Sequence, residues 1–123
     1  SARLVPAEVG YCNAHGTATR IGDPVEWAAL AEVWGADLPR LRVSSTKGLH
    51  GHLLGAAGAL EAVITIMALQ RQRLPANGGS APDAACPLAL VQPGDEGAPG
   101  LQAAISSSFA FGGTNATLAF GRA

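Results

Sequence analysis

The stretch GHLLGAAGALEAVITIMALQRQ, residues 51–72, contains the most apolar run of the chain and largely decides the fold. From His52 to about Gln72 apolar residues recur at the spacing of a helical face, at Leu53, Ala57, Leu60, Ile64 and Met67. The other faces are apolar too, at Leu54, Val63, Ile66 and Leu69. A helix that is apolar all round is surrounded by protein, so this segment predicts one long buried helix.

The residues before this helix predict two strands and a second helix. Residues 9–14 and 41–45 are short aliphatic segments bounded by turn or loop residues, which is typical of buried strands. Between them, Asp23 as a cap, a proline at the first helical position and Glu26 predict the start of a helix. Gly35 is the expected end of that helix.

The second half of the chain predicts a proline-rich connector and further strands. Residues 74–100 carry most of the prolines and indicate irregular surface chain, with one short strand at 88–91. Residues 101–107 and 115–120 are strand-like and are joined through the glycine-bearing loop 109–114. The order of elements predicts an α/β fold in which helices cover a sheet, with candidate polar groups at strand ends.

Composition excludes several function classes. Eight basic and nine acidic residues leave a net charge of −1, so we expect neither nucleic acid nor an acidic membrane as a partner. Cys12 and Cys86 lie far apart, which argues against a zinc site or a disulfide framework and favours a reducing cytoplasm. Residues 1–6 show no secretory signal and no initiator methionine, so we expect the start to be internal to a longer gene product. Leu53–Leu69 includes Glu61 and falls short of the roughly 20 residues of a bilayer span.

The histidines are the main chemical resource of the sequence. His15 and His52 lie in glycine-flanked segments that allow close approach of a substrate, and a structural role is the alternative for each. His50 and His52 form an H-x-H pair that could bind a metal, although no suitable third ligand lies nearby.

Two further features have both a functional and an ordinary interpretation. Lys47 and Glu61 could neutralise each other in a buried pair, or both could be solvated. The loop 109–113 could be a mobile aromatic gate, or an ordinary turn with two core phenylalanines.

Five motifs stand in a characteristic order: NAHGT at 13–17, GDP at 22–24, SSTK at 44–47, GHLLGAAGA at 51–59 and FGGTN at 111–115. Together they resemble the β-ketoacyl-acyl-carrier-protein synthase family of the thiolase superfamily. The resemblance runs from about Val9 to Gly121 and is weakest at 76–100. It is closest to bacterial elongating synthases of the second type, with modular polyketide synthase domains as relatives. It implies that residues 1–123 are a thiolase-like C-terminal half: a mixed sheet covered by helices, with one long buried helix.

The resemblance also implies a reaction. Members of the family are acyltransferases in which a cysteine accepts an acyl chain, and a malonyl carrier then loses carbon dioxide to give an enolate that attacks the acyl thioester. His15 and His52 match the catalytic histidines, whose N–H groups would stabilise the negative charge on the thioester oxygen. Lys47 matches the active-site lysine, Glu61 the acidic residue held near it, and Asp23 a structural aspartate at a helix start.

The C-terminal motif implies a gate and an oxyanion site. Phe109 matches the gating phenylalanine of the acyl pocket, and Phe111 and Gly112 belong to the loop whose backbone amides help to form the oxyanion hole. Ala110 stands where many members have glycine, which would stiffen the gate if its backbone needed positive φ. His50 has no counterpart role. No metal or cofactor is implied, because the substrates are carried on the phosphopantetheine of acyl carrier protein.

The nucleophilic cysteine of the family lies in an N-terminal half that is not in this chain. Members pack two similar halves around one active site and dimerise largely through that other half. We therefore expect acyl carrier protein and an N-terminal half as partners, a homodimer when complete, no activity from this half alone, and exposed core surface on it.

Two other functions stay open. One is a non-catalytic synthase-like subunit or remnant that shapes the chain-length pocket of a complete synthase, although such a subunit need not keep His15, Lys47 and His52. The other is a small metal-binding protein that uses His50 and His52. Fatty-acid, polyketide and aryl-polyene pathways are all compatible with the main hypothesis, as is any acyl-chain length.

Overall fold

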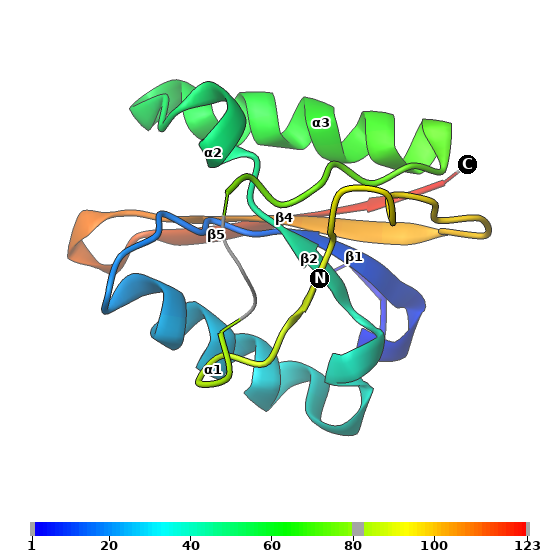
Figure 1. Ribbon diagram of the computed structural model, residues 1–123, viewed down its shortest axis with the longest axis horizontal. Coiled ribbons are helices and arrows are strands. Elements are labelled where there is room, and N and C mark those ends of the chain that lie inside the picture. The colour runs from blue at the N-terminus through cyan, green and yellow to red at the C-terminus, as the bar shows by residue number, and fades with distance from the viewer. Residues whose placement is uncertain (1, 80–82, 123) are drawn as a thin grey trace.

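A five-stranded mixed sheet runs through the middle of the molecule, with helices on both faces (Figure 1). The structure, a computed structural model, describes residues 2–79 and 83–122. The strands are β1 (Val9–Asn13), β2 (Arg42–Ser44), β3 (Ala89–Leu90), β4 (Ala103–Phe109) and β5 (Asn115–Gly121), in the order β3-β2-β1-β4-β5. The first four are parallel and β5 pairs antiparallel with β4. The predicted α/β fold with a mixed sheet is confirmed.

Helix α1 (Gly22–Trp34) covers one face of the sheet, between the short 3-10 helices η1 (Pro6–Glu8) and η2 (Gly35–Arg40). Leu30 joins a core cluster of strand residues there. The helix ends as predicted at Gly35, where φ is +51°. The predicted cap is wrong: the helix begins one residue before Asp23 without a capping side chain, and the Gly22 amide instead donates to Thr19 Oγ1 at 3.0 Å.

The opposite face carries α2 (Lys47–His50), η3 (Leu54–Ala56) and α3 (Ala57–Arg71). The long helix thus begins later than the predicted His52. Leu54 has a φ of +51°, which a non-glycine residue seldom adopts, and its amide donates to the His52 ring rather than to a helical carbonyl. The apolar pattern marks the helix correctly, but the local contact of His52 delays its start.

The prediction that α3 is buried on all sides is wrong for this chain. One face is buried on the sheet, through Ala57, Glu61, Thr65, Ala68 and Leu69. The other face stays exposed, with Val63 at 53%, Ile66 at 38% and Met67 at 36%. A helix lying on one sheet has protein on one side only, so the apolar outer face shows core-like surface without a cover, as the sequence leads us to expect of a separated half.

The same helix bears on the membrane question. By length and composition alone, Leu54–Arg71 is long and apolar enough to cross a membrane. The apolar run Leu53–Leu69, taken from sequence alone, was too short for this. Core helices of soluble proteins pass the same test. Glu61 lies fully buried against Lys47 on the sheet side of α3, which favours a core helix.

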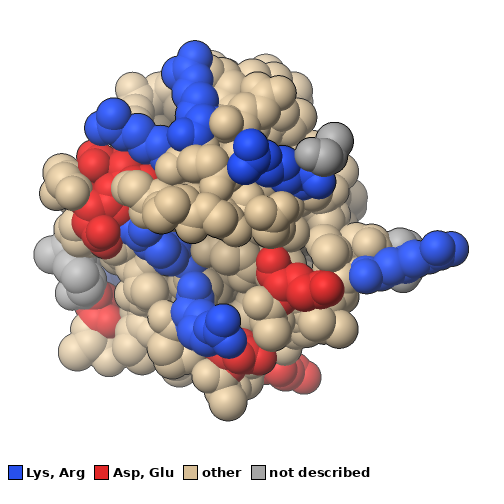
Figure 2. Space-filling model, turned by 90° about the vertical axis from the view of Figure 1, so that its right-hand side faces the viewer, with Lys and Arg blue, Asp and Glu red and all other residues tan. Residues whose placement is uncertain are grey.

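Charged side chains of both signs are interspersed on the face that carries the C-terminal end of α3 (Figure 2). Ion pairs join Arg42 to Asp95 at 3.0 Å and Arg73 to Glu96 at 3.8 Å. This mixture matches the near-zero net charge of −1.

Candidate active site

The candidate site lies at the carboxyl ends of the parallel strands. β1 and β2 end side by side, with Asn13 paired to Ser44, and β4 on the other side pairs Ser106 with Asn13. The loop after β1 begins with His15, and the turn after β2 leads to Lys47. Because neighbouring parallel strands end at one edge of a sheet, residues far apart in sequence meet there.

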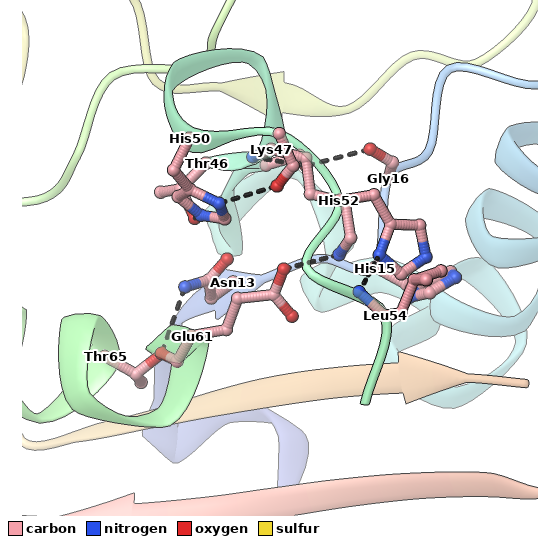
Figure 3. A network of polar contacts seen from close by, with 12 residues as sticks. Asn13, His15, Gly16, Thr46, Lys47, His50, His52, Leu54, Glu61 and Thr65 are labelled. Carbon is pink, nitrogen blue, oxygen red and sulfur yellow. Dashed lines mark hydrogen bonds and ion pairs between the residues drawn. The ribbon is translucent and has the colours of Figure 1, made fainter. Parts of the chain in front are cut away.

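The two histidines of the glycine-flanked motifs converge (Figure 3). The ring centroids of His15 and His52 are 5.6 Å apart in an edge-to-face arrangement, and the Phe109 ring lies 5.6 Å from that of His15. The Leu54 amide donates to Nδ1 of His52 at 3.1 Å. A neutral His52 therefore carries its proton on Nε2, on the other edge of the ring.

The surroundings of His15 disfavour its charged form. Burial lowers the pKa of His15, and the positive charge of Lys47 and then the His52 ring lower it further. A neutral imidazole keeps one N–H donor and carries no charge at neutral pH.

Lys47 and Glu61 form a buried ion pair, so the interpretation with both solvated is excluded. Lys47 Nζ lies 2.5 Å from Glu61 Oε1, with the lysine 8% and the glutamate 0% exposed. The backbone carbonyl of Glu61 accepts the Asn13 amide at 3.2 Å and the Thr65 hydroxyl at 2.7 Å. These contacts fix the pair between α2, α3 and the end of β1.

Glu26 is a site residue that the sequence reasoning missed. Its two carboxylate oxygens accept the backbone amides of His15 at 2.8 Å and Gly16 at 2.9 Å, and the residue is 5% exposed. Burial raises the pKa of Glu26, and the two amide hydrogen bonds oppose that rise. The signal in the sequence is a glutamate near the start of α1, whose spacing from Asp23 predicts a capping box although its carboxylate binds the preceding loop.

The remaining predicted residues separate into those at the site and those away from it. Asp23 lines a cavity of about 710 Å³ that also reaches Lys47 and His52. Phe111 is fully exposed, which excludes it as a core residue, and Gly112 turns the chain in η4 (Phe111–Gly113) with a φ of +77°. Ala110 is extended, with a φ of −125°, so alanine is not strained there.

His50 does not behave as a metal ligand. Its Nδ1 donates to the Gly51 carbonyl at 2.7 Å, and Nε2 lies 3.0 Å from the Thr46 hydroxyl. Both ring nitrogens are thus occupied. In the part of the chain that the structure describes, no group of three or more histidine, cysteine or acidic side chains could hold a metal ion.

Cys12 does not have the surroundings of a nucleophile. Cys12 is fully buried in β1, and burial strongly raises the pKa of its thiol. Cys86 lies on the connector and lines the edge of the 710 Å³ cavity.

Comparison with known proteins shows the family of the chain. Residues 1–80 match the family model described as "Beta-ketoacyl synthase, C-terminal domain". The chain is 43% identical over 122 residues to 3-oxoacyl-[acyl-carrier-protein] synthase 2 of Coxiella burnetii, covering 98% of this chain and 29% of that protein. The chain therefore spans less than a third of the length of this curated relative.

Solved structures give the same result. A β-ketoacyl synthase from Burkholderia phymatum matches with 40% identity and a TM-score of 0.87, covering 99% of this chain and 29% of that one. A chain of the complex between a ketosynthase and its chain length factor from Xenorhabdus doucetiae matches with 38% identity and a TM-score of 0.83. The match covers 99% of this chain and 30% of that one. A structure of a type II polyketide synthase acyl-carrier protein in complex with its ketosynthase matches with 26% identity and a TM-score of 0.87. The match covers 95% of this chain and 29% of that one.

The fold thus has the architecture of thiolase-like ketosynthases. The chain belongs to the β-ketoacyl synthase family and matches its C-terminal domain.

Proposed function

We propose that this chain supplies the histidine pair of a β-ketoacyl-acyl-carrier-protein synthase, an acyltransferase that condenses a malonyl thioester with an acyl thioester. The convergence of His15 and His52, with ring centroids 5.6 Å apart, carries the proposal. Two N–H donors from separate loops can point at one oxygen only when the fold brings the loops together.

The chemistry follows from where charge develops. When the malonyl group loses carbon dioxide, the electron pair of the broken C–C bond forms an enolate, and negative charge builds on the thioester oxygen. N–H donors from His15 and His52 stabilise that oxygen as its charge grows, and preorganised donors of this kind lower the barrier. The enolate carbon then attacks the acyl thioester, forming the new C–C bond and releasing the thiolate that carried the acyl group.

Lys47 and Glu61 support the histidines electrostatically. The Lys47 charge helps to keep His15 neutral, and Glu61 compensates the lysine so that a cation is tolerated in a buried position. Phe109, in contact with the His15 ring, is placed to gate the acyl pocket, and the loop with Phe111 and Gly112 would offer backbone amides to an oxyanion.

The acyl-accepting cysteine is proposed to come from an N-terminal half, because Cys12 is inaccessible and Cys86 lies on a connector. In this proposal residues 1–123 are the C-terminal domain, active with that half in a cytoplasmic homodimer. Acyl carrier protein would deliver the substrates on phosphopantetheine, and no metal or other cofactor takes part. Support for the carrier comes from the similarity to a ketosynthase solved with an acyl-carrier protein.

The alternative, a non-catalytic chain-length subunit, has one supporting observation, the similarity to a chain of a ketosynthase and chain length factor complex. A subunit without chemistry does not require His15, His52 and the Lys47–Glu61 pair to be assembled. Their joint assembly favours the catalytic role.

The test is reconstitution. The chain is combined with a cysteine-bearing N-terminal half, and condensation of malonyl and acyl carrier proteins is followed by mass spectrometry, with release of labelled carbon dioxide measured separately. We expect His15→Ala and His52→Ala each to lower decarboxylation by about 10²-fold or more, with weaker effects on malonyl binding. Absence of condensation with every half supplied, or full decarboxylation by the double variant, would refute the proposal.

A further inference from the structure

Ser45 lies at the point where three segments of the site meet. Its hydroxyl donates to the Gly16 carbonyl at 2.8 Å, and its amide donates to Asn77 Oδ1 at 2.9 Å. Its carbonyl accepts the Gly78 amide at 3.2 Å. The residue thus connects the loop that carries His15, the turn before Lys47 and the connector after α3.

The backbone at His15 and Gly16 is held from two sides. Glu26 accepts the amides of His15 and Gly16, and Ser45 donates to the carbonyl of Gly16. Gly16 has a φ of +37°, and a Cβ added to it would lie 2.6 Å from Ser45 Cβ, so the two backbones are already in close contact. The position of His15 is therefore set by α1 on one side and by Ser45 on the other.

The hydroxyl of Ser45 links the two loops beyond the point where the Ala14 amide bonds the Ser44 carbonyl at 2.9 Å. Among the hydrogen bonds found within residues 2–79 and 83–122, it makes the only one that joins segment 15–21 to segment 45–50. Lys47 follows two residues later, and its own amide lies 3.4 Å from the same hydroxyl oxygen. Without this oxygen the loop of His15 keeps its bonds to Glu26 and the bond from the Ala14 amide to the Ser44 carbonyl, but it loses its side-chain bond to the segment that carries Lys47.

We propose that Ser45 is a positioning residue of the active site, which holds the imidazole of His15 at a fixed distance from the ammonium group of Lys47. The catalytic consequence rests on the proposed function, whereas the structural coupling does not. Loss of the link lets His15 move toward water and away from the Lys47 charge. Since burial and that charge both lower the pKa of His15, the pKa then rises toward its ordinary value.

The first experiment needs no activity. The three histidines of the chain are titrated by NMR, with the His15 signal assigned by its loss in a His15→Asn variant. We expect Ser45→Ala to raise the pKa of His15 toward 6.5, and Ser45→Thr, which keeps the hydroxyl, to titrate like the wild type. Thr117→Ala is the matched control, because it removes an exposed hydroxyl on β5 that lies 3.3 Å from the Ser107 hydroxyl on β4. An unchanged His15 titration in Ser45→Ala overturns the proposal.

The second experiment uses the enzyme reconstituted with its cysteine-bearing half. We expect Ser45→Ala to lower kcat for decarboxylation roughly tenfold with KM changed less than about twofold, because small displacements of a catalytic group cost rate more than binding. If Ser45→Ala fails to fold, Ser45→Cys is used instead, because it keeps the side-chain volume but has a much weaker hydrogen-bond donor. A Ser45→Cys variant with the His15 titration and the decarboxylation rate of the wild type overturns the proposal. An inactive wild-type enzyme refutes the proposed function alone, since the titration still decides the role of Ser45.

Discussion

Replacement of Glu61 by glutamine is the sharpest test of the buried pair. The substitution keeps the shape of the side chain but leaves Lys47, only 8% exposed, without the carboxylate 2.5 Å away. Breaking a buried pair by removing one partner costs ~3–5 kcal/mol, because the other charge stays buried without compensation. At pH 7 a lysine side chain can shed its proton for about 5 kcal/mol, which sets a ceiling on that cost.

The free energy of unfolding can be measured by urea titration of the chain, followed by the fluorescence of Trp27 and Trp34 on α1. We expect Glu61→Gln to lower it by ~3–5 kcal/mol. Glu32→Gln, on the exposed face of α1, is the matched control and should change it by less than about 0.5 kcal/mol. The double variant Lys47→Met/Glu61→Gln should lose about 2 kcal/mol less than the sum of the two single variants. Strict additivity, or a loss below about 1 kcal/mol for Glu61→Gln, would refute a tightly coupled pair.

Two further predictions follow from the geometry of the His15 loop. Burial is the first cause and the Lys47 charge the second cause of the lowered pKa of His15, so Lys47→Met should raise that pKa. If decarboxylation requires neutral His15, the rate of the variant should then fall at a higher pH on acidification than the rate of the wild type. A pH–rate profile whose acid limb does not move to higher pH contradicts this prediction. Gly16→Ala would place a Cβ 2.6 Å from Ser45 Cβ at a residue with a φ of +37°. It should therefore lower the free energy of unfolding by about 2–4 kcal/mol. Gly97→Ala, with open space around it, is the control and should be nearly neutral. Equal losses for the two glycine variants in urea titration would show that the contact between Gly16 and Ser45 is not tight.

Much of the fold could be predicted because its elements are written in local patterns. The apolar run of residues 51–72 indicates a long helix, and the glycine at position 35 ends α1 where expected. The errors arose where a side chain accepts backbone amides of a loop instead of supporting the helix that the pattern predicts. Glu26 contacts the loop of His15 instead of completing a capping box, and His52 binds the Leu54 amide and delays the start of α3.

The apolar outer face of α3 shows a different limit. Val63, Ile66 and Met67 have the side chains of core residues, and the sequence therefore predicts that they are covered. In this chain the sheet covers one side of the helix only, so these residues stay exposed. A hydrophobic pattern predicts that a surface is buried, but it does not predict which chain packs against that surface.

The amino-acid sequence by itself determined the class of fold, the main helices and strands and the residue types available for chemistry, because these depend on local propensity and on apolar periodicity. Only the tertiary structure decided that His15 meets His52, that Lys47 pairs with Glu61 in the interior, and that Glu26 and Ser45 hold the loop between them. The physical reason is that these contacts join different loops and helices, which the sheet brings together. Their distances depend on how parallel strands pair in the sheet, and no local pattern encodes that pairing.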